Sequence, residues 1–269
     1  MTLTYSIADV APYINWIYFY HAWGMSGKPV DDQQLLRREA EERLQRYAKT
    51  YHTHALFRLY DAYSEGDDIV VDGGRIPCLR QQQGAECLCL ADFIAPRDCP
   101  SSAPHYAESS RVGVFATTVD SGMETDFRAD PYEQMMMQLL ADRLAEATAE
   151  LLHLEVRRRY WGYAPAEQLP VAGLLQEQWQ GIRPAVGYPS LPDTSLNFVL
   201  DALLHLSTIG IRLTESGAMK PHASVSGLML AHPAARYFTV GRVGEDQLVD
   251  YARRRGLPVE VIRKFIGNT

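Results

Sequence analysis

Cysteine is scarce in this chain of 269 residues: there are four, and all of them lie between positions 78 and 99. Cys87 and Cys89 are separated by one residue, which is not the C-x-x-C spacing of zinc sites or of thioredoxin-type redox sites. Reduced cysteines that serve as small buried side chains are common in intracellular proteins. We therefore expect buried thiols here, and neither a disulfide framework nor a thiolate metal site.

Positive charge is also in short supply. Lysine and arginine total 26 against 33 aspartate and glutamate, which gives a formal net charge of −7. Such a chain has no overall field that would draw it to nucleic acid or to an anionic membrane. Two short helices expected at 245–255 and 259–266 superficially resemble a helix-turn-helix, but the second carries few basic residues. We predict no nucleic acid and no membrane among its partners.

A long aliphatic run is absent as well. Residues 10–27 carry no charge, but they include Pro12, Asn15 and His21 among several tyrosines and tryptophans, unlike a bilayer-spanning helix. No basic region precedes this run, so it does not resemble a signal peptide. We interpret it as an aromatic-rich segment that packs into a core, and we expect the protein to be cytoplasmic.

The common nucleotide-binding and hydrolase motifs are missing. The sequence has no G-x-G-x-x-G after a strand, no phosphate-binding G-x-x-x-x-G-K-[ST], no G-x-S-x-G and no H-E-x-x-H. His52 and His54 are the closest pair of histidines, and surface histidines are a commoner outcome than a metal site. Standard nucleotidase, serine hydrolase and zinc protease functions are therefore disfavoured.

The hydrophobic pattern changes irregularly between a period of two residues and a helical period. This irregular alternation, with hairpins in place of strand-helix-strand units, predicts an α+β fold in which helices flank a twisted antiparallel or mixed sheet. We find no linker, so we expect a single domain over 1–269. The predicted strands are 55–63, 69–71, 87–95, 111–119, 209–214, 224–230 and 236–243, and the predicted helices are 31–51, 131–161, 174–178, 194–208, 245–255 and 259–266.

The loop at 181–189 is the most unusual stretch. Pro184 holds the backbone of Arg183 extended, and Gly187 and Pro189 shape the exit, so Arg183 and Tyr188 are presented by a stiff segment. A guanidinium held in this way can bind a carboxylate through two hydrogen bonds. Taken alone, the loop is somewhat better interpreted as a structural corner whose arginine pairs with a neighbouring acid.

The long helix predicted at 131–161 carries two further features. Asp142 and Glu146 share a face one turn apart, where a solvated surface is the default interpretation and a cation site the alternative. The three arginines at 157–159 are interpreted as favourable positive charge at the end of a helix.

Two segments near the C-terminal end suit a binding site as well as a core. The small side chains at 223–227 permit close approach of the backbone to a ligand or to another strand. Tyr237 and Phe238 would form an aromatic wall for a heterocycle or fill part of the core.

Several short motifs follow one another along nearly the whole chain. They are 13–16 (YINW), 90–96 (LADFIAP), 141–147 (ADRLAEA), 158–164 (RRYWGYA), 180–185 (QGIRPA) with 187–189 (GYP), 214–216 (TES), 223–227 (ASVSG), 237–238 (YF) and 250–252 (DYA). Together they resemble the activation, or reactivation, domain of cobalamin-dependent methionine synthase, and the R-x-x-x-G-Y element is the most specific of them.

The resemblance implies the fold of that family and binding of S-adenosylmethionine (AdoMet) without a Rossmann domain. It implies a set of site residues, of which Glu146 and Glu177 fall on acidic positions near the ligand and the others on ligand-binding positions: Asp92, Arg183, Tyr188, Tyr237, Phe238, Glu146 and Glu177. The residue types suit AdoMet, because its carboxylate matches an arginine, its ammonium and sulfonium favour carboxylates, and its adenine suits an aromatic wall.

The implied activity is support of reductive methylation of oxidised cobalamin by AdoMet. The chain carries no D-x-H-x-x-G cobalamin signature and starts where the family's module starts, so it is either an excised fragment or, the interpretation we prefer, a free-standing protein. The cobalamin-binding methionine synthase core would then act in trans, and a flavodoxin-like or other protein would donate the electron. Two other functions stay open: a methyltransferase acting alone on a small acceptor, and a ligand-sensing or interaction protein.

This chain departs from the family pattern at Thr194, where a histidine is usual, and at Lys220, where a tryptophan is usual. The resemblance implies that the loss of the histidine alters contact with the corrinoid partner and leaves ligand binding intact.

Overall fold

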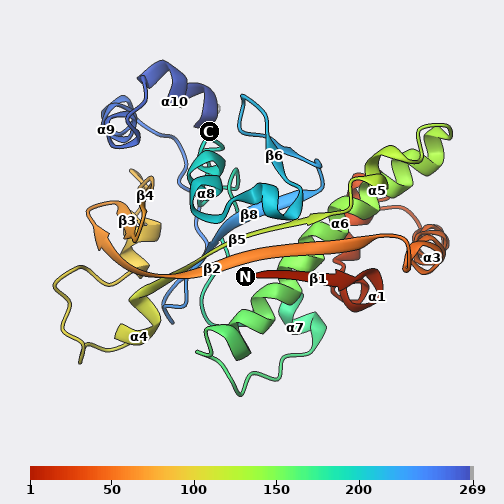
Figure 1. Ribbon diagram of the computed structural model, residues 1–269, viewed down its shortest axis with the longest axis horizontal. Helices are drawn as coiled ribbons and strands as arrows, with labels where there is room; N and C mark the ends of the chain where they lie inside the picture. The colour runs from red at the N-terminus through yellow and green to blue at the C-terminus, as the bar shows by residue number, and fades with distance from the viewer. Residues whose placement is uncertain (267–269) are drawn as a thin grey trace.

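The computed structural model describes residues 1–266, and a six-stranded antiparallel sheet forms its centre (Figure 1). The sheet has the order β4-β3-β2-β5-β8, with β1 paired to β2 outside this path. Its strands are β1 (Thr2–Ser6), β2 (His52–Glu65), β3 (Asp68–Val71), β4 (Gly74–Pro77), β5 (Arg111–Val119) and β8 (Ser224–Met229), and a separate small ribbon pairs β6 (Arg212–Leu213) with β7 (Met219–Lys220). The predicted α+β class with an antiparallel sheet is confirmed.

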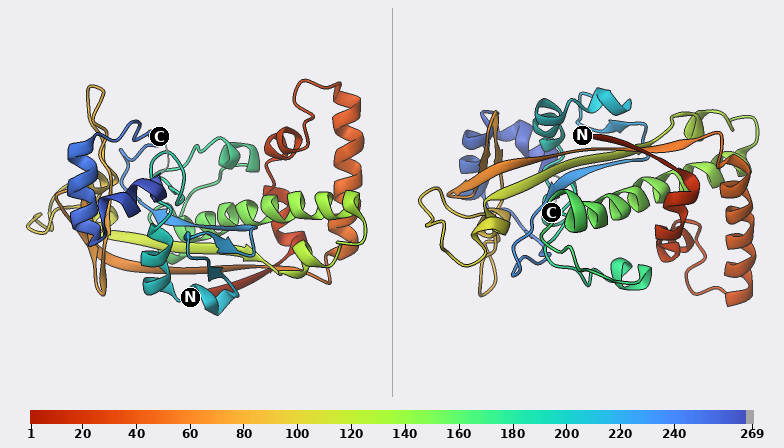
Figure 2. Two further views of the ribbon diagram at one scale, coloured as in Figure 1. Left: turned by 90° about the horizontal axis from the view of Figure 1, so that it is seen from above. Right: turned by 60° about the horizontal axis from the view of Figure 1, so that its bottom comes forward.

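Helices cover the sheet and stand at both of its ends. They are α1 (Ile7–Val10), α2 (Trp16–Ala22), α3 (Val30–Tyr47), α4 (Tyr106–Ser109), α5 (Gly122–Thr125), α6 (Pro131–Glu155), α7 (Val171–Leu175), α8 (Leu196–Leu204), α9 (Glu245–Arg255) and α10 (Val259–Ile266). The long helix α6 runs along the sheet, while α3 and the α9–α10 pair lie at opposite ends of the molecule (Figures 1 and 2).

The centre of the sheet is buried on both faces, because a helix packs on each. Successive side chains of a strand point to opposite faces. Phe57 of β2 and Phe115 of β5 therefore pack against α6, whereas their neighbours Leu56 and Val114 belong to the cluster that contains α8. This explains why the eight residues after Arg111 in β5 are all buried.

The predicted elements with clear end signals are confirmed. The carboxylate of Asp130 accepts hydrogen bonds from the backbone N–H groups of Tyr132 and Glu133 and so caps α6. Gly256 ends α9 in the left-handed conformation, with φ of 65°. The hairpin, α3, β5, α6, β8, α9 and α10 all lie where the pattern places them.

Three strand predictions are wrong in whole or in part. Within 87–95 a 3-10 helix forms at Leu90–Phe93, because the carboxylate of Asp92 accepts the backbone N–H of Cys89 and closes a turn. Residues 236–243 form no strand, since their backbone groups bond to loop atoms such as the carbonyl of Pro189. Of 209–214, only the two residues of β6 are extended.

The interpretation of the arginines at 157–159 is wrong for Arg157. Helix α6 continues as a π-helical turn, Val156–Tyr160, and this turn directs Arg157 into the protein. Its side chain is 0% exposed and forms two hydrogen bonds, of 2.7 and 2.8 Å, with Glu167. Arg157 is therefore part of a buried ion pair.

The uncharged run at 10–27 packs into the core on one side only. Ile14 and Phe19 are buried in the cluster beneath α3 and α6, while Ile17 and Tyr18 are largely exposed. No helix within the described residues is both long enough and apolar enough to cross a bilayer.

All four cysteines carry free thiols, and Cys78 and Cys89 are buried while the other two are partly exposed. Within residues 1–266, no group of three or more histidine, cysteine, aspartate or glutamate side chains is arranged to hold a metal ion. The Nε2 atom of His54 lies 2.8 Å from the Oδ1 atom of Asp120, and His52 lies 3.7 Å from the same carboxylate.

Candidate functional site

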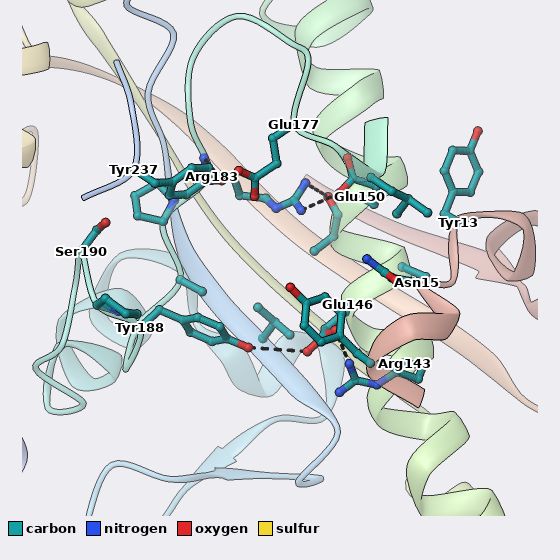
Figure 3. A pocket seen from close by; sticks show the side chains of 18 of the residues that line it. Tyr13, Asn15, Arg143, Glu146, Glu150, Glu177, Arg183, Tyr188, Ser190 and Tyr237 are labelled. Carbon is teal, nitrogen blue, oxygen red and sulfur yellow. Dashed lines mark hydrogen bonds and ion pairs between the residues drawn. The ribbon is translucent and has the colours of Figure 1, made fainter. Parts of the chain in front are cut away.

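An open cavity of about 720 Å³ lies between α2, α6 and two loops of the C-terminal half (Figure 3). One wall is formed by α6, which contributes Glu146 and Glu150. The loop that contains Arg183 and Tyr188 forms the opposite wall, and the segment with Tyr237 closes one end. A cavity of this size accommodates a metabolite of nucleoside dimensions.

The loop at 181–189 is fixed to β8 by backbone hydrogen bonds. Ile182 exchanges two bonds of 2.9 Å with Leu230, and the carbonyl of Pro184 accepts the N–H of Leu228 at 2.9 Å. Such close approach requires glycine: a Cβ on Gly227 would lie 2.2 Å from the Pro184 carbonyl oxygen. The small residues at 223–227 therefore serve approach to another backbone segment, one of the two roles predicted for them.

Arg183 reaches from this loop to α6. One terminal nitrogen donates to the carbonyl of Ala149 at 2.9 Å and the other to the Oε2 atom of Glu150 at 2.8 Å. The Arg183 and Glu150 side chains are 14% and 8% exposed. Burial acts to lower the pKa of Arg183, but the nearby carboxylate of Glu150 leaves that pKa raised, so the guanidinium stays charged. The neighbouring acid foreseen for a structural corner is therefore present, yet it lines the cavity.

The main chain of Arg183 is held from a different side. Its backbone N–H donates to the hydroxyl of Tyr237 at 2.9 Å, which ties the loop to the segment that closes the cavity. Burial raises the pKa of Tyr237, so this phenol stays protonated.

The acidic residues named from the sequence face the same space. The Oε2 atom of Glu146 accepts from Arg143 at 2.7 Å, and the Tyr188 hydroxyl lies 3.5 Å from its Oε1 atom (Figure 3). Glu177 sits in a left-handed conformation with φ of 56° beside Arg183. Burial raises the pKa values of both Glu146 and Glu177. A nearby positive charge, from Arg143 for Glu146 and from Arg183 for Glu177, opposes this effect and favours the ionised carboxylate.

Of the seven residues named from the sequence, six line this cavity: Arg183, Tyr188, Tyr237, Phe238, Glu146 and Glu177. Asp92 does not. Its carboxylate forms two hydrogen bonds, of 2.6 and 2.8 Å, with the guanidinium of Arg80. Gln81, which follows Arg80, donates to the carbonyl of Thr239, a residue that does line the cavity.

The sequence reasoning missed Glu150, the partner of Arg183. Its signal was available, because Glu150 follows Glu146 by one helical turn and therefore shares its face of α6. Tyr13 and Asn15 line the far end of the cavity; they belong to the motif at 13–16, for which the sequence predicted no role in the site.

A smaller hollow of about 240 Å³ adjoins the cavity along α6 and shares Glu146 and Tyr188 with it. Asp142 lies there, 3.6 Å from the Nδ1 atom of His222. Burial raises the pKa of Asp142.

Comparisons with known proteins agree with this architecture. A family model described as vitamin B12 dependent methionine synthase, activation domain, matches residues 6–256. Among solved structures, the crystal structure of the MetH reactivation domain bound to AdoHcy matches with a TM-score of 0.90 and 35% sequence identity, covering 100% of this chain and 89% of that one. The chain belongs to the family of the vitamin B12-dependent methionine synthase activation domain.

Proposed function

We propose that this chain binds AdoMet in the cavity beneath Arg183 and supports reactivation of a cobalamin-dependent methionine synthase. A relative of 35% identity is bound to S-adenosylhomocysteine (AdoHcy), the demethylated form of AdoMet. The observation that carries the proposal is the charged, preformed Arg183 facing a cavity of about 720 Å³ that is also lined by the carboxylates of Glu146, Glu150 and Glu177.

The chemistry of the lining suits the parts of AdoMet. Arg183 uses one hydrogen on each terminal nitrogen within the protein, so its Nε–H and the remaining hydrogens are available to a carboxylate. Glu146 and Glu177 match the positive charges of the ligand, and Tyr237 and Phe238 match the adenine. Asp92 does not line the cavity, so it would act indirectly, by holding the Arg80 side chain in place.

The role of this chain is then placement of the methyl group. The reduced cobalt of the partner would supply the electron pair that accepts the methyl group, while the C–S bond of AdoMet would break with its own electron pair left on sulfur. The electron comes from a separate donor such as a flavodoxin-like protein. The cavity is open and needs no general base, because binding and orientation are what the protein contributes.

We further propose that the cobalamin-binding core of methionine synthase meets this chain in trans. The exposed rings of Tyr18 and Tyr188 border the cavity, which leaves the bound sulfonium within reach of a second protein.

Calorimetry with AdoMet tests the binding step. Removing Arg183 alone would leave Glu150 buried without its partner, which costs about 3–5 kcal/mol of stability. The informative variant is therefore the double substitution Arg183→Met and Glu150→Gln, with Arg111→Met, a surface arginine paired with Asp61, as the control for lost positive charge. We expect binding to be lost in the double variant and kept in the control. Equal affinity in all three proteins would remove Arg183 from the site.

The activity is tested by mixing the protein with a methionine synthase that lacks its own activation domain. Under reducing conditions with AdoMet, absorbance should report the formation of methylcobalamin. Binding without this change would point to a ligand-sensing protein, and turnover of AdoMet without any corrinoid would point to a methyltransferase that acts alone.

A further inference from the structure

A buried indole connects Arg183 with the buried ion pair of Arg157. The Trp179 side chain lies beneath both guanidinium groups, whose central carbons are 4.7 Å (Arg157) and 5.7 Å (Arg183) from the ring centroid. Trp179 is 9% exposed and does not line the cavity. Arg183 is the cavity residue that the ring contacts through its face, so an effect of Trp179 on a ligand can pass through this guanidinium.

The ring is packed between charged and aromatic neighbours, although its Nε1 atom has no hydrogen-bond partner among the described residues. Arg157 is fixed by its two hydrogen bonds to Glu167, and the imidazole of His153 meets the indole edge-on at 5.4 Å between centroids. His153 is fully buried, and burial together with the two nearby arginines holds its pKa well below the usual value. The histidine is therefore neutral, and the cations beside the ring are the two arginines.

The ion pair between Arg183 and Glu150 uses only one of the two carboxylate oxygens. Arginine and carboxylate groups commonly pair through two parallel hydrogen bonds. Here one bond forms, to Oε2, while the Oε1 atom of Glu150 is buried without a partner among the described residues. An unpaired buried oxygen is costly, so a guanidinium free to rotate would turn to bind both oxygens. Two contacts oppose such a rotation: the hydrogen bond from Arg183 to the carbonyl of Ala149 and packing of the guanidinium against Trp179.

We propose that Trp179 is a positioning residue for Arg183. By holding the guanidinium in its single-bonded pairing with Glu150, the indole keeps the other N–H groups directed to the carboxylate of the ligand. This inference rests on the proposed binding of AdoMet. It assigns to Trp179 the recognition of the amino-acid end of the ligand and no part in recognition of the nucleoside. Preorganisation of this kind raises affinity by reducing the ordering that binding requires.

A pair of ligands separates this role from a general effect on folding. AdoHcy carries the amino-acid end, whereas methylthioadenosine has the same nucleoside and sulfur without a carboxylate. We expect Trp179→Leu to weaken AdoHcy by about tenfold while leaving methylthioadenosine within about twofold, a size typical of a desolvated cation–π contact. The measurement is titration calorimetry on the full chain.

Two more variants complete the test. Trp179→Phe keeps a smaller and less electron-rich ring, so we expect a loss of about threefold for AdoHcy alone. This variant keeps the inference testable if the leucine variant does not fold. Trp161→Leu removes a different tryptophan, a half-buried one that packs against Tyr163 and does not line the cavity, and should leave the ratio of the two affinities unchanged.

The outcomes distinguish this inference from the proposed function. A wild-type protein that binds neither ligand overturns the proposed function and the inference together. A wild type that binds both, with Trp179 variants that weaken both equally or neither, overturns the inference alone. A selective loss for AdoHcy that is smaller in Trp179→Phe than in Trp179→Leu supports it.

Discussion

Substituting Gly227 by alanine tests whether close contact between β8 and the arginine loop builds the site. The added Cβ would lie 2.2 Å from the carbonyl oxygen of Pro184 and 2.9 Å from the Cα atom of Ala185. Both are backbone atoms, which cannot rotate away as the end of a side chain can. The loop must therefore retreat from the strand by about 1 Å to restore ordinary contact distances.

That retreat has a cost that follows from the hydrogen bonds it stretches. The bonds from Val186 to Ser226 and from Leu228 to Pro184 are each 2.9 Å, and an added 1 Å takes both beyond the usual limit. Two lost bonds at about 1 kcal/mol each, together with about 1–3 kcal/mol for the extra methyl group, predict a loss of about 3 kcal/mol or more. Arg183 moves with the loop, so we also expect affinity for AdoMet to fall at least about tenfold.

Denaturant unfolding measures the first effect and calorimetry the second. Gly74→Ala is the matched control, because its added Cβ meets only a methyl carbon of Leu203, at 3.3 Å, which can shift. We expect the control to cost less than about 1 kcal/mol and to bind AdoMet normally. If Gly227→Ala unfolded at the same denaturant concentration as the control and bound AdoMet equally well, the argument from close approach would be refuted.

The pKa values of Glu146 and Glu177 are raised by burial, so both carboxylates lose protons at a higher pH in the folded protein than their ordinary value of 4.5. As pH rises above 4.5 these carboxylates gain negative charge, so the protein's preference for AdoMet, with its sulfonium, over AdoHcy, with its neutral sulfur, should increase and then level off. Calorimetry measures both affinities, and a preference that is flat from pH 4.5 to 8 would contradict this expectation. A raised acid pKa also means that these two groups stabilise the fold less as pH rises through the folded value. Thiol titration should find two reactive cysteines in the folded protein and four after unfolding, since two are buried; four fast-reacting thiols in the folded state would contradict the described packing.

Local signals in the sequence were sufficient for the elements that carry their own ends. Helix α6 begins at a capping aspartate followed by proline, and α9 ends at a glycine, so both could be predicted from a few residues. The segment 87–95 shows where this fails. Its apolar residues suit a strand or a turn equally, and a single side chain, Asp92, bonds to the backbone three residues earlier and settles the choice in favour of the turn.

Most residues of the site could be predicted from the sequence, but the contacts between them could not. The stiff loop indicated that Arg183 is held in position to bind an acidic group, and the resemblance supplied the chemical class of the ligand. Its actual partner, Glu150, comes from a helix 33 residues earlier in the chain, as the hydrogen bond between them shows. No local pattern encodes that pairing. The burial of Arg157 was unpredictable for a similar reason, because it depends on a π-helical turn and on Glu167 from the next loop.

Helix α6 explains why the site and the core are difficult to separate. One side of the helix packs on the sheet through residues such as Leu152, and the other offers Glu146, the carbonyl of Ala149 and Glu150 to the cavity. A turn of the helix about its axis would move both sides at once. The arginine loop, for its part, is bonded to β8, which belongs to the same sheet. The two walls of the cavity are thus fixed to one framework, so the spacing between the carboxylates and the guanidinium is set before any ligand arrives.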